Sequence, residues 1–194
     1  MNNYKKNSII LFQRLVLVTL LYQITRVLFF VFNTSSFTTF NFQTFKGGLL
    51  FDLSSIAYLN LIFSIAHLIP GNFKYSLGYQ KKLTISFYAL NLLFIATNFI
   101  DIIYYRFTGR RSTFTMITAK GMEREAIGLI PSFLKEFWYI GVLFVVLSFI
   151  LWRILPDFKR VGSINTLTKK EIVKQSCYLI MALVIGLIVA RGGF

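Results

Sequence analysis

The chain contains few of the residues on which disulfide-linked, metal-binding and catalytic folds depend. Its 194 residues include one Cys (Cys177), one His (His67) and three Pro, and only seven are Asp or Glu. A single Cys excludes an internal disulfide framework, and one His with scattered carboxylates offers no ligand set for a metal site. Neither a redox compartment nor a cofactor can be inferred from these residues.

Sequence motifs of soluble enzymes are missing as well. The chain has no glycine-rich phosphate loop, no HExxH motif and no paired-cysteine spacing. No histidine is available as a general base for the Ser or Thr residues, and the seven carboxylates are too scattered for a two-metal centre. We therefore expect no catalytic residue, no metal ligand and no cofactor in this chain.

Apolar side chains dominate the composition. Hydrophobic residues make up 56% of the chain and charged residues 14%, whereas a soluble domain has about 45–50% and about 25%. A soluble domain of this length could not bury so much apolar surface, and 22 Phe with 10 Tyr exclude intrinsic disorder. With a mean hydropathy of +0.65, the composition indicates an integral membrane protein.

The charge is strongly unbalanced, because 21 Lys and Arg face seven Asp and Glu, which gives a formal net charge of +14. Such an excess can indicate nucleic acid, an anionic membrane surface or an anionic substrate as the partner. In so apolar a chain the favoured interpretation is flanking charge that sets membrane topology. We therefore expect membrane lipids with anionic or phospholipid headgroups as partners, and no nucleic acid.

Five apolar stretches have about the length that a helix needs to cross roughly 30 Å of hydrocarbon. They are residues 9–32, 49–69, 83–105, 137–155 and 172–190. The sequence thus predicts an all-α fold, a polytopic membrane helix bundle of five transmembrane helices that forms a single transmembrane domain over residues 1–194. The first stretch is too long for a signal peptide and lacks a small-x-small cleavage site, which favours a retained anchor.

The apolar stretches are rarely interrupted by helix breakers. They contain few Gly and no Pro, and no repeat at a fixed period is visible. An internal repeat or helices broken near the membrane midplane would be typical of a secondary transporter. The pattern instead predicts unbroken helices.

Lysine and arginine are unevenly distributed between the ends of these stretches. With Lys5 and Lys6 in the cytoplasm, the second and fourth connections also face the cytoplasm. Both are basic, as required by the charge rule that Lys and Arg are enriched in cytoplasmic loops. Their basic residues are Lys74, Lys81, Lys82, Lys159, Arg160, Lys169 and Lys170. The first connection, with Lys46 alone, faces outward. We therefore expect a multi-pass protein of the bacterial inner (cytoplasmic) membrane with a cytoplasmic N-terminus and an extracytoplasmic C-terminus.

The third connection violates this charge rule. It would place basic residues outside, among them Arg106, Arg110, Arg111, Lys120 and Arg124. Inverting the topology would break the charge rule in three places and repair it in one. The external position of the basic third connection therefore needs another explanation. Apolar and charged residues also alternate in this connection, which predicts short interfacial helices between the third and fourth spans. Their apolar residues are Phe114, Ile117, Met122, Ile127 and Ile130.

Ionisable residues of the expected spans fall at one depth, near the outer leaflet. They are Arg26, Asp52, Asp101, Arg106, Glu136 and Arg191, and Arg110 and Arg111 follow the third span. Charges in such positions usually pair and face the bundle interior. Structural pairing, in which Asp52 and Asp101 neutralise nearby arginines, is the first interpretation. A polar mouth that receives a lipid headgroup is the second, and both can hold together.

Three asparagines lie deeper in the expected spans, where each amide needs a hydrogen-bond partner. Asn91 and Asn98 are seven residues apart and share a helix face that Asp101 extends, and Asn60 lies in the second span. Interhelical packing is the favoured interpretation of these residues, and a transport path is the alternative. We interpret His67, near the end of the second span, as a hydrogen-bonding residue rather than a proton relay.

Three segments resemble the membrane domain of the lipoteichoic acid synthase and phosphoglycerol transferase family. The first is FDLSSIAYLN at residues 51–60, and the last is ARGGF at residues 190–194. The most specific is NFIDIIYYRFTGRRST at residues 98–113, where an Asp-x-x-Tyr-Tyr motif precedes Arg-Arg-Ser-Thr. The resemblance covers essentially the whole chain, and five spans with an external C-terminus fit the family's membrane domain.

The resemblance implies a longer enzyme of the alkaline-phosphatase and sulfatase superfamily. Members of the family continue into an extracellular domain with a Thr or Ser nucleophile and a divalent metal held by acidic residues and His. That domain transfers or hydrolyses phosphoglycerol, phosphoethanolamine or sulfate groups. The nucleophile and the metal ligands of that domain have no counterpart in this chain. The resemblance therefore implies an N-terminal fragment or a truncated gene product.

Two functions follow as expectations. The first is the membrane-anchoring domain of a lipoteichoic-acid-synthase-like or sulfatase-like transferase of phosphoglycerol or phosphoethanolamine. Such a domain would position an outer-leaflet lipid for its own C-terminal catalytic domain. The alternative is a self-contained five-span membrane transporter or an interaction scaffold.

Overall fold

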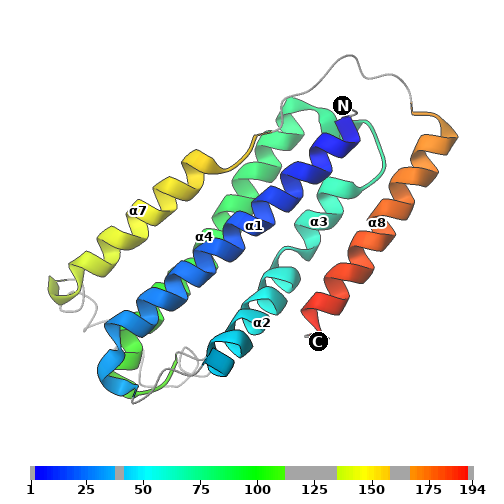
Figure 1. Ribbon diagram of the computed structural model, residues 1–194. Coiled ribbons are helices and arrows are strands. Elements are labelled where there is room, and N and C mark those ends of the chain that lie inside the picture. The colour runs from blue at the N-terminus through cyan, green and yellow to red at the C-terminus, as the bar shows by residue number, and fades with distance from the viewer. Residues whose placement is uncertain (1–2, 38–41, 112–134, 158–166, 192–194) are drawn as a thin grey trace, which may run out of the picture. The chain divides into compact units, whose positions relative to one another are not determined.

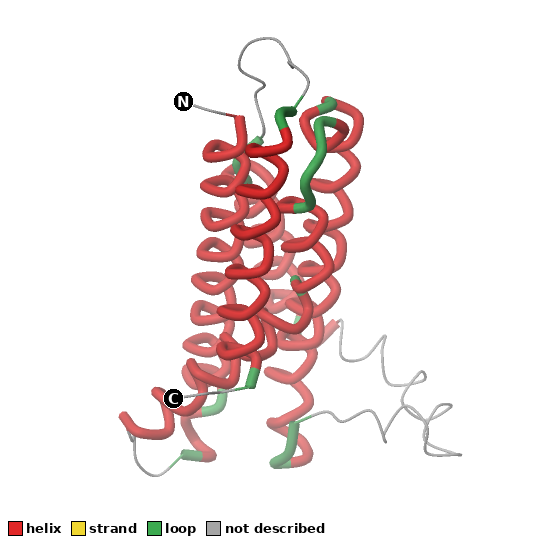
Figure 2. Tube along the Cα trace, turned by 90° about the vertical axis from the view of Figure 1, so that its right-hand side faces the viewer, coloured by secondary structure: helices red, strands yellow, loops and turns green. Residues whose placement is uncertain are grey.

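The protein is described here by a computed structural model that covers residues 3–37, 42–111, 135–157 and 167–191. Within these ranges every regular element is helical and no strand is present (Figures 1 and 2). The predicted all-α fold class is therefore confirmed for the described residues. The stretch expected to form interfacial helices, residues 112–134, lies outside them.

All five apolar stretches are helical over most of their length. The α-helices are α1 (Asn3–Phe32), α2 (Phe42–Leu59), α3 (Leu61–Leu68), α4 (Leu77–Thr108), α7 (Trp138–Ile154) and α8 (Lys169–Ala190). Two short 3-10 helices, η1 (Thr34–Ser36) and η2 (Phe73–Tyr75), lie in the connections that follow α1 and α3. α1 contains neither Gly nor Pro, so no residue interrupts its backbone hydrogen bonds over 30 residues.

The helices form two compact units, which we describe separately. Unit 1 comprises residues 1–22, 41–91 and 154–194, and unit 2 comprises residues 23–40 and 92–153. The first parts of α1 and α4 therefore belong to unit 1 and their second parts to unit 2. In unit 1, α2 and α3 both pack against α8. In unit 2, α4 and α7 meet at Phe99 and Phe144, whose ring centroids are 5.4 Å apart.

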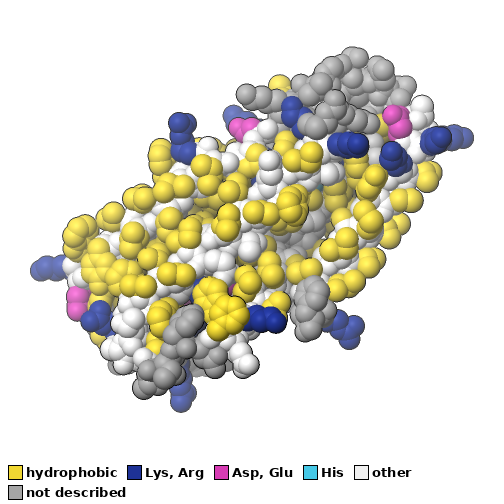
Figure 3. Space-filling model, in the orientation of Figure 1, with side chains coloured by type: hydrophobic (Ala, Val, Ile, Leu, Met, Phe, Trp, Pro, Cys, Tyr) yellow, Lys and Arg dark blue, Asp and Glu magenta, His cyan; other side chains and the backbone are white. Residues whose placement is uncertain are grey.

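Three helices, α1, α4 and α8, are long and apolar enough to cross a membrane. The pair α2 and α3 adds a fourth if it is counted as one span, whereas α7, with 17 residues, is shorter. Large apolar side chains on these helices are exposed, among them Phe12 (68%), Leu93 (62%) and Ile180 (61%), and hydrophobic side chains cover the face in Figure 3. The exposed apolar side chains on these helices are compatible with lipid as the solvent. The number of five spans stays a prediction.

The second expected span is broken, and the prediction of unbroken helices is wrong here. α2 and α3 are separated at Asn60, and the two helix axes differ in direction by 53°. The amide side chain of Asn60 donates to the carbonyl of Ile56, and the carbonyl of Asn60 accepts from both the amide and the hydroxyl of Ser64. Side-chain hydrogen bonds of this kind compete with the helical pattern and bend helices without Pro or Gly.

Local sequence also fixes two helix ends. α8 begins with a capping box, in which the Thr168 hydroxyl accepts from the amide of Glu171 and the Glu171 carboxylate accepts from the amide of Thr168. α4 ends at Thr108 and is followed by Gly109, whose φ of +64° lies in the left-handed region that glycine adopts without a Cβ penalty. The position of Gly109 places the next two arginines just beyond the helix.

Candidate functional site

Three basic side chains are exposed where α4 ends in unit 2. Arg106 lies in the last turn of α4, and Arg110 and Arg111 follow Gly109. We call these three residues the arginine end. The Thr108 hydroxyl accepts a hydrogen bond from the amide of Arg110 and donates one to its carbonyl, which holds the backbone at this point.

Aromatic rings surround the arginine end. Phe29 meets Tyr105 edge-on at 5.0 Å, and Phe37 stacks on Tyr105 at 5.7 Å with an interplanar angle of 6°. The guanidinium carbon of Arg111 lies 4.6 Å from the centroid of the Phe29 ring. This distance is within the range of a cation–π contact, which holds the guanidinium beside an apolar cluster.

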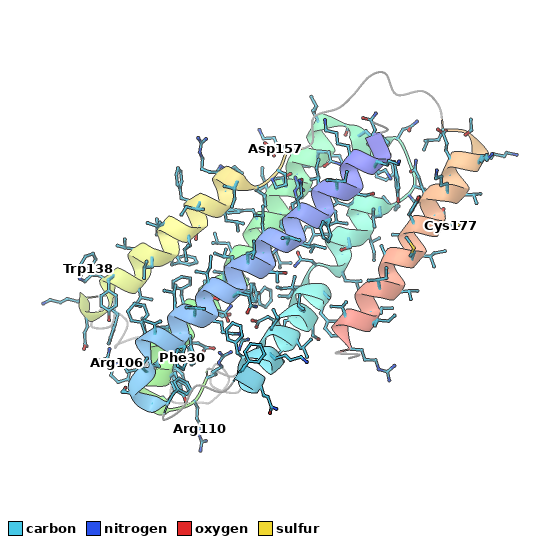
Figure 4. All side chains as sticks on the ribbon, in the orientation of Figure 1. Phe30, Arg106, Arg110, Trp138, Asp157 and Cys177 are labelled. Carbon is cyan, nitrogen blue, oxygen red and sulfur yellow. The ribbon has the colours of Figure 1, made fainter. Side chains whose placement is uncertain are left out.

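A second cation–π contact involves Arg106, whose guanidinium carbon is 5.8 Å from the Phe137 ring centroid. Arg106 also borders a small groove that is otherwise apolar or aromatic. The groove is lined by Phe32, Ile102, Ile103, Arg106, Phe137, Tyr139 and Ile140. Arg110 has no such ring partner in the described part of the chain and reaches away from the helix ends (Figure 4).

Guanidinium groups in this arrangement suit a phosphate ligand. Each guanidinium is permanently charged and presents a planar fork that can donate two parallel hydrogen bonds to phosphate oxygens. All three guanidinium groups are exposed. The arginine end could therefore hold a phosphate group beside an apolar surface.

The other ionisable residues predicted for the site are divided between the two units. In unit 2, Asp101 is buried, Arg26 is half-buried and Glu136 is exposed. In unit 1, Asp52 is buried in α2, and the exposed Arg191 follows the end of α8. Asp52 and Arg191 lie at the same end of unit 1, because the Ser54 hydroxyl donates to the carbonyl of Ala190.

The deeper asparagines behave differently from one another. Asn60 and Asn91 are both fully buried and exchange two amide hydrogen bonds, of 3.0 and 2.9 Å. The remaining amide hydrogens go to the carbonyls of Ile56 and Phe87, so every N–H of the pair has an acceptor. Asn98 is half-buried, and its side chain forms no hydrogen bond with another described residue. It lies beside the buried face of α4, on which Ile95 and Phe99 are found.

Sequence reasoning missed a cluster of buried polar side chains in unit 1, which we call the buried polar cluster. All of its members are at most 7% exposed, and they belong to α1, α3, η2, α4 and α8. They are Asn7, Arg14, His67, Lys74, Gln80, Thr84 and Gln175. Asn7 connects three of these elements, because its amide donates to the carbonyl of His67 and its oxygen accepts from Gln80 at 3.0 Å.

Arg14 is fully buried in this cluster, with no exposed surface. Its guanidinium donates from Nε and Nη2 to the carbonyl of Pro156, at 3.2 and 2.9 Å, and from Nη2 to the hydroxyl of Thr84. Arg14 thereby fastens the segment after α7 to α1 and α4. A charge in the middle of an apolar stretch was the sequence signal for this role, since such residues face the interior of a helix bundle.

His67 completes the surroundings of Arg14. Its Nε2 lies 3.0 Å from Nη1 of Arg14, and its Nδ1 lies 2.9 Å from the carbonyl of Phe63. Because arginine only donates, Nε2 must be the acceptor, and the proton of the neutral ring must therefore lie on Nδ1. This arrangement is consistent with the predicted hydrogen-bonding role of His67.

Lys74, counted among the topology charges in the sequence, is fully buried in the connection between α3 and α4. Its ammonium donates to Oε1 of Gln175 at 3.1 Å and lies 4.7 and 5.3 Å from the ring centroids of Tyr4 and Tyr75. Burial lowers the pKa of Lys74 to about 8 and raises the pKa of Tyr75 to about 12. The ammonium thus joins α1, α8 and the connection at the cost of desolvating a charge.

The part of the chain that the structure describes contains no group of three or more His, Cys, Asp or Glu that could hold a metal ion. The candidate features described above are the arginine end in unit 2 and the buried polar cluster in unit 1. Comparison with models of protein families, with curated proteins and with solved structures finds no match to this chain.

Proposed function

We propose that this chain is the membrane-anchoring domain of a lipoteichoic-acid-synthase-like or sulfatase-like transferase, and that its arginine end binds the phosphate of an anionic lipid. The transferred group would be phosphoglycerol or phosphoethanolamine. The enzyme class rests on the sequence resemblance at residues 51–60, 98–113 and 190–194. The lipid site rests on the exposed arginines at the end of a helix long enough to cross a membrane.

The observation that carries the lipid site is the setting of Arg106, Arg110 and Arg111. All three are exposed, and two of them lie over aromatic rings at distances of 5.8 and 4.6 Å. Aromatic side chains are enriched at the level of lipid headgroups. A guanidinium at that level can bind a phosphate while the adjacent rings contact the upper part of the acyl chains.

The lipid site is tested with the double variant Arg110→Ala and Arg111→Ala. If the arginines bind a lipid phosphate, each lost charge-assisted hydrogen bond should weaken retention of phosphatidylglycerol by about 1.5–3 kcal/mol. Native mass spectrometry measures this retention, and a melting curve in detergent checks the fold. Arg153→Ala is the matched control, because Arg153 is an exposed arginine in the last turn of α7. Unchanged lipid retention with a lowered melting temperature would contradict the headgroup site.

The enzyme class is tested on the gene and on the purified chain. Several hundred codons downstream of Phe194 that encode a metal-binding catalytic domain would support the anchoring function, whereas a stop codon would favour the alternative function. The purified chain should lack metal-dependent phosphodiesterase or sulfatase activity, since catalytic metal sites need about three protein ligands. Turnover of a chromogenic phosphodiester that survives repurification would contradict this expectation.

The proposed topology, with a cytoplasmic N-terminus and an extracytoplasmic C-terminus, is tested by thiol labelling. Cys177 is exposed and must first be replaced by Ser. Single cysteines at Lys81, beside the start of α4, and at Phe194 should then be labelled from opposite sides of the membrane. Labelling of both positions from one side would contradict five spans.

One observation favours the alternative function, a transporter. The break between α2 and α3 at Asn60 is the kind of interruption found in many transporter helices. However, the amides of Asn60 and Asn91 bond to each other and to backbone carbonyls, which leaves no free donor for a substrate. A flux assay in proteoliposomes tests this alternative, and transport that is lost in Asn91→Leu would favour it over the anchoring function.

A further inference from the structure

Three helices of unit 1 begin at one end of that unit. Near the beginning of α1, Asn7 accepts a hydrogen bond from Gln80, one turn into α4. Tyr4 lies beside Tyr178 of α8, with ring centroids 5.5 Å apart. Lys74, just before α4, donates to Gln175 of α8. The beginnings of α1 and α4 therefore lie beside each other, and the second and third turns of α8 are their neighbours.

Lysine side chains are concentrated at this end, which we call the lysine end. One of them is half-exposed and the others are exposed, and all lie within the first two turns of α1, α4 and α8. They are Lys5, Lys6, Lys81, Lys82, Lys169, Lys170 and Lys174. Figure 3 shows Lys and Arg side chains gathered around the beginning of α8. The lysine end is thus a strongly charged surface of unit 1.

Little negative charge balances these lysines. Among the described residues at this end the carboxylates are Asp157 and Glu171, and Glu171 is engaged in the capping box of α8. Beneath the surface, Arg14 and Lys74 add two fully buried cations. The beginning of each helix also carries the positive end of its dipole, where cations are disfavoured. The positive potential therefore exceeds what the protein itself neutralises.

We propose that the lysine end binds the headgroups of anionic phospholipids in the leaflet that surrounds it. This proposal does not rest on the proposed function, because it uses other residues in another unit. An apolar surface adjoins the lysines, since Leu77 is 69% exposed, Val173 63% and Ile9 46%. Lipid tails cover such a surface, and the lysine stems can lie along it while the ammonium groups reach the headgroups. A polyanion in solution would not cover these side chains.

The two ends should differ in selectivity. An ammonium is a hydrated point charge, whereas a guanidinium recognises the planar pattern of acceptors in phosphate. We therefore expect the lysine end to respond to headgroup charge alone, and to lose its preference in high salt. Phosphatidylglycerol and phosphatidylserine should bind equally well there.

The experiment measures lipid at the lysine end with a local tryptophan. Trp138 and Trp152 are replaced by Phe, and Leu77→Trp places a reporter one turn before Lys81. The full chain is placed in nanodiscs, and quenching by brominated phosphatidylglycerol is compared with quenching by brominated phosphatidylcholine. Phosphatidylglycerol should be enriched at least about fivefold at the reporter, the factor that one lysine near an anionic surface contributes. Equal quenching by the two lipids would overturn the proposal.

Variants assign the preference to the lysines. Lys81→Gln, Lys82→Gln, Lys169→Gln and Lys170→Gln together should abolish the enrichment, and the corresponding Lys→Arg variant should retain it and control for folding. Arg110→Gln with Arg111→Gln is the matched control and should leave the enrichment unchanged, which separates this proposal from the proposed function. Enrichment that persists in the glutamine variant would overturn the proposal. So would preferential binding of an acidic peptide or an oligonucleotide with no preference among lipids.

Discussion

Nε2 of His67 accepts a hydrogen bond from Nη1 of Arg14 across 3.0 Å, in a place where neither side chain has exposed surface. The imidazole thus serves as a neutral acceptor for a buried cation, together with the carbonyl of Pro156. Neutral acceptors in place of a carboxylate leave the site with a net positive charge. Removing any of these acceptors would leave part of a buried guanidinium without a partner, which is costly in a low-dielectric interior.

Arg14→Ala should destabilise the protein by about 1–3 kcal/mol, because the carbonyl of Pro156 loses its buried donor. Arg14→Lys should recover only part of this loss, because an ammonium lacks the fork that reaches both Pro156 and Thr84. Unfolding in detergent with increasing dodecyl sulfate measures the free energy. Arg153→Ala, at an exposed arginine, is the control, and an equal loss in both variants would contradict the role of Arg14.

The asparagine pair gives a double-mutant cycle. Asn91→Leu should cost about 1–2 kcal/mol, because it leaves the Asn60 amide unpaired in an apolar environment. Asn60→Leu combined with Asn91→Leu should cost less than the sum of the single changes, since no orphaned amide remains. Asn98→Leu is the control and should stay within about 0.5 kcal/mol of the parent. Additive single losses would show that the two amides do not depend on each other.

Lys74 predicts an unusual dependence of stability on pH. Its pKa is about 8 in the folded protein, against about 10.4 for an exposed lysine, so the unfolded state binds more protons between these values. Stability should therefore rise from about pH 8 to about pH 10, by about 1–2 kcal/mol. Tyr75, whose pKa is about 12, acts in the opposite direction above about pH 10, because only the unfolded phenol ionises there.

Lys74→Met should remove this rise, whereas Lys82→Met, at an exposed lysine, should leave it intact. Melting temperatures between pH 7 and pH 10 provide the measurement, with the range chosen to exclude most of the Tyr75 contribution. A slope that persists in Lys74→Met would assign the pH dependence to another group.

Two neighbouring arginines should separate stability from lipid binding. Arg111 lies over the Phe29 ring, so Arg111→Gln should destabilise unit 2 by about 0.5–1 kcal/mol. Arg110 is exposed and has no ring beneath it among the described residues, so Arg110→Gln should leave stability unchanged while weakening phosphatidylglycerol retention. Phe29→Leu should reproduce the effect of Arg111→Gln on the melting temperature. A stability loss in Arg110→Gln equal to that in Arg111→Gln would contradict this division.

Much of the fold could be predicted from the sequence, because the length and polarity of apolar stretches determine where membrane helices form. The second apolar stretch was expected to end at residue 69, and α3 ends at Leu68. The break at Asn60 could not be predicted by the same rules. It depends on hydrogen bonds to Ser64 and to Asn91, and Asn91 is 31 residues away in the sequence.

For the candidate sites, the sequence predicted exposure correctly only for residues whose position in the chain, such as just beyond a helix end, determines that exposure. Arg110 and Arg111 follow a helix end and are exposed, as expected for a charged segment beyond a span. Lys74 has the same charge as Lys81 and a similar setting in the sequence, yet it is buried. The difference arises from Tyr4 and Gln175, which only the folded chain brings to it.

The hydrogen-bonded pair of Asn60 and Asn91 also constrains the order of assembly. While a nascent chain has inserted only α1 to α3, the Asn60 amide lies in the bilayer without the partner that α4 carries. An unpaired amide in hydrocarbon favours return of its segment to the interface. The pair α2 and α3 should therefore insert stably into the membrane only together with α4. Release of α4 from the ribosome would then be the step after which α2 and α3 stay inserted.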